Sequence, residues 1–182
     1  MINIESSYRP NEIGRTLYEL VLDVRPETIV EFGVLNGYSS ICMAMALKEL
    51  GRGKVIAYDL WDDYEYNHGN QETVMENLEM YGVEEYVELR HGEFDGWLKN
   101  PIPFDLIHID ISNDGNTILA AYEALKESIE AGSVMAFEGG TEERDGIEWM
   151  IRFGKVPICS VKDRVDYAVL DAAFPSLSVI KR

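Results

Sequence analysis

Short apolar runs and amphipathic stretches alternate along most of the chain. Residues 11–24 repeat apolar side chains every three to four positions, the spacing of one helical face, and Pro26 ends this stretch. Further helical patterns occupy 38–50, 71–81 and 114–131. Between them lie apolar runs of strand composition, at 28–32, 54–59, 86–90, 104–110 and 133–138. This order predicts an α/β fold, a doubly wound, mostly parallel sheet with helices on both faces.

The last forty residues depart from that alternation. A short helix is expected over 142–153, and the charged residues 142–145 indicate its polar, solvent-facing start. The apolar runs 156–161 and 165–170 are separated by three residues, a spacing that suits a hairpin. We therefore expect seven strands with an antiparallel C-terminal hairpin. The length of 182 residues fits a single domain over 1–182, with the helical segment 1–26 packed on it.

The charge balance restricts the partners of the chain. Sixteen basic and 33 acidic residues give a formal net charge of −17, which repels phosphate backbones and anionic lipid surfaces. We expect no nucleic-acid partner and no membrane partner, and a small-molecule substrate remains open. Whether the chain forms a homo-oligomer is also open.

Hydropathy gives an expectation about location. No apolar run reaches the roughly 18 residues that a membrane helix requires, and the first ten residues lack the pattern of a signal peptide. A cytoplasmic protein is expected.

Candidate ligand-binding residues follow the predicted strands. In an open α/β sheet, ligands bind outside the carboxyl ends of the strands. Gly33 and Gly37 follow the first strand, where they allow a tight turn and a close backbone approach. Tyr38 and Ser39 then begin a helix whose first amides have no partner within it.

Two acidic residues suggest what such a ligand contains. Asp59 ends the second strand, where a carboxylate can accept hydrogen bonds from both hydroxyls of a ribose. Glu31, before the glycine turn, could bind an ammonium group. The glycine spacing is Gly-x-x-x-Gly, so the Gly-x-Gly-x-x-Gly pattern of nicotinamide enzymes is absent. These features indicate a nucleoside that carries an amino acid.

Three segments, EFGVLNGYSS, YDLW and FDLIHID, resemble the first, second and fourth strand motifs of class I S-adenosylmethionine-dependent methyltransferases. The resemblance implies that S-adenosylmethionine is the cofactor and that the chain is a methyltransferase. It places Glu31 at the methionine amino group, Gly33 and Gly37 along the cofactor, and Asp59 at the ribose. It also implies adenine contacts from residues that follow the second and third strands, namely Trp61, Glu93 and Phe94.

Within that superfamily the sequence is most similar to small-molecule O-methyltransferases, including the macrolide-sugar type, whose fourth strand reads HIDG followed by an acid and a His. Asn113 stands where that subgroup carries its general-base His. We therefore expect Asp110, at the end of the fourth strand, to orient or deprotonate an acceptor hydroxyl. His68, in the polar loop after the second strand, is a second catalytic candidate, or else a solvated side chain.

Divalent-metal O-methyltransferases offer a comparison for the residues after the fifth strand. They pair the acid after the fourth strand with Asp-Asn or Asp-Asp after the fifth, where this chain has Glu138 and Gly139. Asp110 and Glu138 could still bind a magnesium or calcium ion, without an evident third ligand.

Two alternatives to O-methylation of a small molecule stay open at this point. One is a non-catalytic binding or interaction domain of the same fold, which the absence of the His at 113 would fit. The other is an enzyme that uses the adenosylmethionine skeleton for a different transfer.

Overall fold

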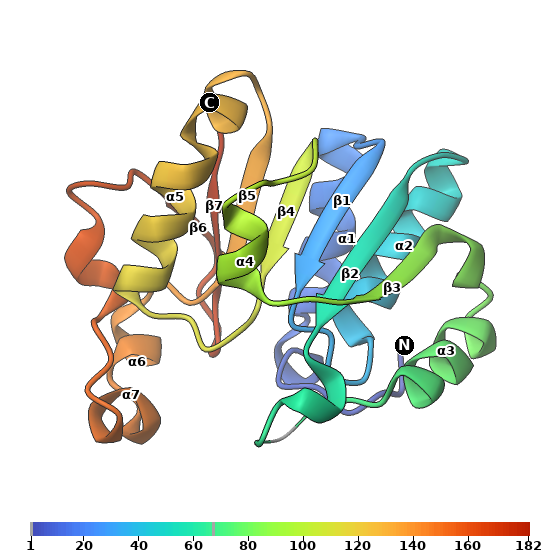
Figure 1. The fold of residues 1–182 in the computed structure, drawn as a ribbon, viewed down its shortest axis with the longest axis horizontal. Coiled ribbons are helices and arrows are strands. Elements are labelled where there is room, and N and C mark those ends of the chain that lie inside the picture. The colour runs from blue at the N-terminus through green and yellow to red at the C-terminus, as the bar shows by residue number, and fades with distance from the viewer. Residues whose placement is uncertain (1, 67) are drawn as a thin grey trace.

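A computed structural model describes residues 2–66 and 68–182 as a seven-stranded sheet covered by helices on both faces (Figure 1). The strand order is β3-β2-β1-β4-β5-β7-β6, and β1 to β5 are parallel while β7 runs antiparallel to β5 and β6. The strands are β1 Thr28–Phe32, β2 Lys54–Asp59, β3 Val87–His91, β4 Leu106–Ile109, β5 Val134–Glu138, β6 Ala168–Asp171 and β7 Leu177–Ile180. The predicted fold class is confirmed.

The helices bury alternate side chains of the strands on the two faces. Helices α1 (Ile13–Val24), α2 (Tyr38–Leu50) and α3 (Gln71–Met80) form one apolar cluster with one face of the sheet. Helices α4 (Phe94–Leu98) and α5 (Gly115–Glu130) lie on the other face, in front of the sheet in Figure 1. The short helices α6 (Glu142–Asp145) and α7 (Glu148–Arg152) lie at the lower edge of that view, where the parallel strands end.

The helices begin and end at residues that suit these positions. The side chain of Asn70 accepts hydrogen bonds from Glu72 N and Thr73 N at the start of α3, and Asp114 accepts one from Thr117 N at the start of α5. Helix α1 ends at Arg25, in the left-handed conformation, directly before Pro26. These caps explain why the predicted boundaries of α1, α3 and α5 agree with the structure to within about two residues. The single helix expected over 142–153 was wrong, because this segment forms the two short helices α6 and α7.

The C-terminal hairpin exists, and the predicted run 165–170 overlaps its first strand, but the run 156–161 is not a strand. Ile158–Val161 forms a 3₁₀ turn, and the hairpin consists of β6 and β7. Ile158 and Val161 are buried three positions apart, which suits one face of a tight helix rather than a strand. The carboxylate of Asp145 accepts hydrogen bonds from Ile158 N and Cys159 N and so holds this turn in place.

The segment before α1 packs against the same face of the sheet as α1 and α2. Ile4 and Tyr8 are buried in the apolar cluster on that face. Among the described residues, no helix has both the length and the apolar character that crossing a membrane would need.

Candidate functional site

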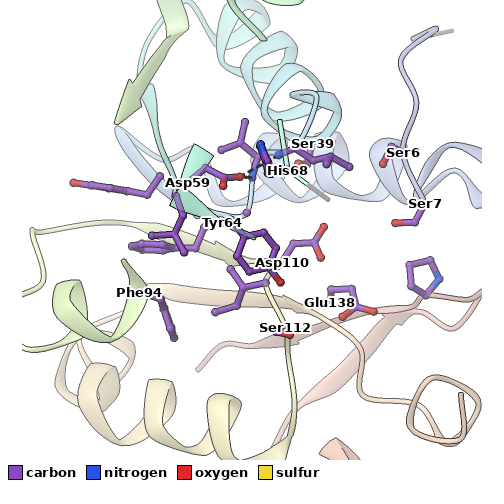
Figure 2. Close-up of a pocket in the computed structure, with 18 of the residues that line it drawn as sticks. Ser6, Ser7, Ser39, Asp59, Tyr64, His68, Phe94, Asp110, Ser112 and Glu138 are labelled. Carbon is purple, nitrogen blue, oxygen red and sulfur yellow. Dashed lines mark hydrogen bonds between the residues drawn. The ribbon is translucent and has the colours of Figure 1, made fainter. Parts of the chain in front are cut away.

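A pocket of about 670 Å³ opens at the carboxyl ends of the parallel strands. In Figure 2, Asp110 lies near the middle of the labelled residues, with Asp59 and Phe94 on one side and Glu138 on the other. The volume falls within the roughly 300–1,000 Å³ of small-molecule sites. Most of the residues that the sequence predicted for cofactor or substrate line this pocket: Gly33, Tyr38, Ser39, Asp59, His68, Glu93, Phe94, Asp110 and Glu138.

Gly33 brings the first turn of the site against the end of β4. Its φ is +89°, and a Cβ built on it would lie 1.8 Å from the carbonyl oxygen of Asp110. No side chain fits there, so the chain needs glycine both for its backbone conformation and for this close approach. The turn and Asp110 therefore share one wall of the pocket.

Asp59 holds the same turn from the other side. Its Oδ2 accepts hydrogen bonds from Val34 N at 2.7 Å and Leu35 N at 3.2 Å, and its Oδ1 accepts one from Trp61 N at 3.2 Å. A carboxylate has about four acceptor positions, so Asp59 can still accept from a ligand hydroxyl. The residue thus orders the glycine turn and faces the pocket.

Phe94 gives the pocket an apolar wall near Asp59. Its ring is buried and packs edge-on against Phe32 at a centroid distance of 4.9 Å. Phe32 stacks in turn on Tyr58, also at 4.9 Å. These three aromatic residues all line the pocket and provide a surface suited to a flat base.

Gly37 and Trp61 lie outside the pocket lining. Gly37 precedes α2 with φ +85°, and its missing side chain makes room for Val74 of α3. Trp61 is buried in the core, and its indole Nε1 donates to Arg90 O at 3.2 Å. Both residues position the loops around the pocket, and neither is placed to touch a ligand in it.

Glu31 also lies outside the pocket lining, in a wholly buried polar network. Its carboxylate accepts a hydrogen bond from Ser40 of α2 and lies 3.1 Å from His108 Nδ1 on β4. The other ring nitrogen of His108 lies 3.5 Å from the hydroxyl of Tyr8. Because Glu31 is wholly buried and lies outside the pocket lining, its contact with the ammonium group of a ligand stays a prediction.

Asp110 is half-buried in the wall of the pocket. Burial raises the pKa of its carboxyl above the ordinary value, the neighbouring His108 and a hydrogen bond from Tyr8 lower that pKa, and Glu31 raises it. A carboxylate whose pKa is raised is a better proton acceptor than an exposed aspartate. The Glu31–His108–Tyr8 network therefore acts electrostatically on Asp110.

His68 lines the pocket from the loop after β2. Its Nδ1 is 2.7 Å from Tyr66 O, and its Nε2 is 3.6 Å from Asp62 Oδ1. Its side chain is about one third exposed. The following Gly69 packs directly on the backbone of Leu35, which holds this loop against the glycine turn.

Glu138 and Arg144 form a buried pair at the end of β5. Arg144 Nε and Nη2 lie 2.5 Å and 3.0 Å from the two carboxylate oxygens of Glu138, and both side chains are about 6% exposed. Burial raises the pKa of Glu138 to about 7, Arg144 opposes this rise, and Asp110 adds to it. Sequence patterning placed 142–145 on a solvent-facing helix start, which is wrong for Arg144.

This pair bears directly on the metal prediction. A guanidinium occupies both oxygens of Glu138, and a divalent cation would compete with it for them. Among residues 2–66 and 68–182, no group of three or more His, Cys, Asp or Glu side chains is arranged to hold a metal ion. The donor set at Asp110 and Glu138 therefore does not fit a divalent ion.

Asn113 is a structural residue. It is wholly buried, and its Nδ2 donates to Ile109 O at 2.8 Å and to Glu138 O at 2.9 Å. The amide ties the ends of β4 and β5 together below the pocket. No proton acceptor for a substrate is offered at this position.

Several lining residues were missed by sequence reasoning because they come from segments without a recognisable motif. They lie before α1, around α6 and α7, and before β7: Ser6, Ser7, Arg144, Ile147, Trp149, Lys155, Phe174 and Pro175. The segment before α1 and the loop before β7 are joined by a hydrogen bond from Asn11 Nδ2 to Phe174 O. These segments enclose the side of the pocket that lies away from Asp59.

A family model described as a methyltransferase domain matches residues 30–138, more than half of the chain. The match begins in β1 and ends with β5, so it covers Gly33, Asp59 and Asp110. The chain belongs to this methyltransferase domain family.

The chain is similar to two named O-methyltransferases. The chain is 27% identical to caffeoyl-CoA O-methyltransferase 1 of Arabidopsis thaliana over 69% of its own length and 47% of that protein. It is 31% identical to catechol O-methyltransferase of Niastella koreensis over 57% and 45% of the two lengths. The chain thus spans about half the length of these relatives.

The fold is that of solved methyltransferases. The O-methyltransferase TomG of Streptomyces achromogenes, solved in complex with SAM, superimposes with a TM-score of 0.63 and 19% identity, covering 98% of this chain and 80% of that one.

Proposed function

We propose that the chain is an S-adenosylmethionine-dependent methyltransferase that methylates a hydroxyl of a small molecule. The observation that carries the proposal is the position of Asp59 and Gly33. Both face one pocket at the carboxyl ends of β1 and β2, beside the aromatic wall of Phe94. Membership of the methyltransferase domain family and the similarity to O-methyltransferases support it.

The residues fit this cofactor. Asp59 would accept hydrogen bonds from the ribose, Phe94 and Glu93 would contact the adenine, and the backbone at Gly33 would lie along the amino-acid part. Tyr38 and Ser39 line the same half of the pocket from the first turn of α2. The bound cofactor supplies an electrophilic methyl group on a sulfonium.

We assign the action on the acceptor to Asp110. It lies between the cofactor half of the pocket and the half enclosed by α6 and α7, where an acceptor hydroxyl would meet the methyl group. Its carboxylate would orient the hydroxyl and accept its proton, while the methyl group passes from the sulfonium sulfur to the hydroxyl oxygen and S-adenosylhomocysteine leaves. His68 also lines the pocket and is available to contact the acceptor.

A cofactor-binding domain without catalytic activity is the second candidate. The buried amide of Asn113 favours it, because no histidine base is present there. The two functions share cofactor binding and differ only in methyl transfer.

Thermal unfolding with S-adenosylhomocysteine and with NAD tests the cofactor. A ligand at 100 times its Kd stabilises the folded state by about 2.7 kcal/mol, so S-adenosylhomocysteine should raise the unfolding temperature and NAD should not. Equal shifts with the two ligands, or a shift with NAD alone, would contradict the proposal. Methyl transfer from labelled S-adenosylmethionine to a panel of small hydroxylated acceptors then separates the enzyme from the binding domain.

A further inference from the structure

Two cationic side chains line the pocket, and both contact the same aromatic ring. Arg144 Cζ and Lys155 Nζ each lie 5.4 Å from the centroid of the Trp149 ring. Apart from His68, the other ionisable side chains of the lining with a formal charge at neutral pH are acidic: Glu5, Asp59, Glu93, Asp95, Asp110 and Glu138. A chain of net charge −17 thus gathers two cations at one place in its pocket.

Arg144 carries a buried donor without a partner. Its Nε and Nη2 bind Glu138, but Nη1 is buried and has no hydrogen-bond partner among the described residues. An unsatisfied charged donor is costly in a folded protein, so Nη1 needs a partner that the described residues do not supply. Because Arg144 lines the pocket, an anionic group of a ligand is a candidate for that partner.

Lys155 leaves this part of the pocket with excess positive charge. Glu138 balances Arg144, whereas none of the ion pairs among residues 2–66 and 68–182 includes Lys155. The lysine is half-buried, so its charge is screened less than that of an exposed lysine. An anionic group placed beside Trp149 would meet both cations.

The rest of this half of the pocket suits the body of a small organic molecule. Ile147 and Phe174 supply apolar surface to the lining, and Ser7 and Ser112 supply hydroxyls. Asp110, which lies toward the cofactor half, would repel a carboxylate and accept a hydrogen bond from a hydroxyl. The pocket therefore favours an anionic group of the acceptor at Arg144 and Lys155 and a hydroxyl group at Asp110.

We propose that Arg144, Lys155 and Trp149 form the acceptor subsite and bind a carboxylate group, so that the substrate is a hydroxylated organic acid. The inference rests on the proposed function and narrows it to one substrate class. The carboxylate lies at the two cations, and the hydroxyl that receives the methyl group lies at Asp110.

Calorimetry on the protein saturated with S-adenosylhomocysteine tests this inference without a need for turnover. The ligands are pairs of hydroxy acids and their neutral amides, such as 3,4-dihydroxybenzoate with 3,4-dihydroxybenzamide and 3-hydroxybutyrate with its amide. In the wild type at least one acid should bind about tenfold more tightly than its amide, the scale of a hydrogen bond to a charged group. The preference should weaken as salt is raised.

The variants remove the cations separately. Lys155→Gln should abolish most of the preference for the acid over its amide. The double variant Arg144→Gln, Glu138→Gln should do the same. Both members of the buried pair are changed together so that neither is left as an unpaired buried charge. Arg152→Gln and Lys162→Gln are matched controls, because each cation lies over an aromatic ring outside the pocket and is exposed. Both controls should keep the preference.

The outcomes separate this inference from the proposed function. If S-adenosylhomocysteine binds but no acid is preferred over its amide, the acid subsite is wrong and the cofactor assignment stands. An acid preference that survives in Lys155→Gln and in the double variant would also overturn the subsite. If S-adenosylhomocysteine itself does not bind, the proposed function is contradicted, and the inference that rests on it falls with it.

Discussion

The carboxylate of Glu31 and the imidazole of His108 lie 3.1 Å apart on neighbouring strands, and solvent reaches neither side chain. The two residues are register partners of β1 and β4, so their side chains emerge on the same face of the sheet. Ser40 and Tyr8 complete the network from α2 and from the segment before α1. The pair and its two partners therefore connect β1 and β4 to α2 and to the segment before α1.

Glu31→Gln should lower the free energy of unfolding by about 3 kcal/mol, because it breaks a buried pair and leaves His108 without its carboxylate. Urea unfolding measures this change. Glu19→Gln is the matched control, since Glu19 pairs with Arg15 at 2.8 Å on an exposed helix face. That variant should lose less than about 1 kcal/mol. Equal losses in the two variants would show that the buried network contributes little.

Gly33→Ala should destabilise the protein by more than about 3 kcal/mol. The added Cβ would overlap the carbonyl oxygen of Asp110, and the residue would keep a left-handed backbone that costs about 1–2 kcal/mol by itself. Gly51→Ala measures the cost of the left-handed backbone alone, because Gly51 has φ +69° and open space around its Cβ position. A Gly33→Ala variant as stable as Gly51→Ala would mean that the turn moves away from β4 at little cost.

Much of the fold could be predicted from the sequence because its determinants are local. The caps at Asn70 and Asp114 and the apolar periodicity of 11–24 act within a few residues of themselves. The strand prediction for 156–161 was wrong because a short apolar run of four to six residues can form a buried turn as well as a strand. The carboxylate of Asp145, thirteen residues earlier, decides between them by binding Ile158 N.

The site was predictable only where a motif follows a strand. Gly33, Asp59 and Asp110 lie in the pocket because parallel strands bring their carboxyl ends together. Glu31 belongs to the same motif, yet the alternation of side chains along β1 turns it toward α2 and His108. Arg144 is drawn into the interior by Glu138, although charge patterning alone predicted a solvent-facing position for residues 142–145.

Asp59→Ala should weaken binding of S-adenosylhomocysteine at least about tenfold, since hydrogen bonds to a charged acceptor contribute about 1.5–3 kcal/mol. The same change removes the acceptor of Val34 N and Leu35 N, so the unliganded protein should also become less stable. Asp62→Ala, on the exposed loop after β2, is the control and should leave affinity unchanged. If calorimetry gives the wild-type affinity for Asp59→Ala, the ribose is bound by other residues.

The rate of methyl transfer should fall on acidification through a pKa above the roughly 3.9 of a free aspartate, because Asp110 must be ionised to accept a proton and burial raises its pKa. Acid unfolding caused by the buried carboxyl groups of this site would not explain the loss of rate. A carboxyl group whose pKa is higher in the folded than in the unfolded protein stabilises the folded protein when it is protonated. For Glu138 this stabilisation is present at low pH and is lost as the pH rises from about 4.5 to about 7. Rate and unfolding free energy, measured over the same pH range, should move in opposite directions.

Methyl transfer should persist when divalent ions are removed. Arg144 already binds both oxygens of Glu138, and displacing it would leave a buried guanidinium without its carboxylate, at a cost of several kcal/mol. The measurement is the transfer rate with EDTA and with added magnesium, for wild type and for Asp110→Asn. We expect the wild-type rate to be equal under the two conditions, and Asp110→Asn to be slower by about 10²–10⁴-fold in both, the usual contribution of a general base. A wild-type rate that collapses in EDTA and returns with magnesium would mean that Arg144 leaves Glu138 during the reaction. An Asp110→Asn variant at full rate would remove Asp110 from proton transfer.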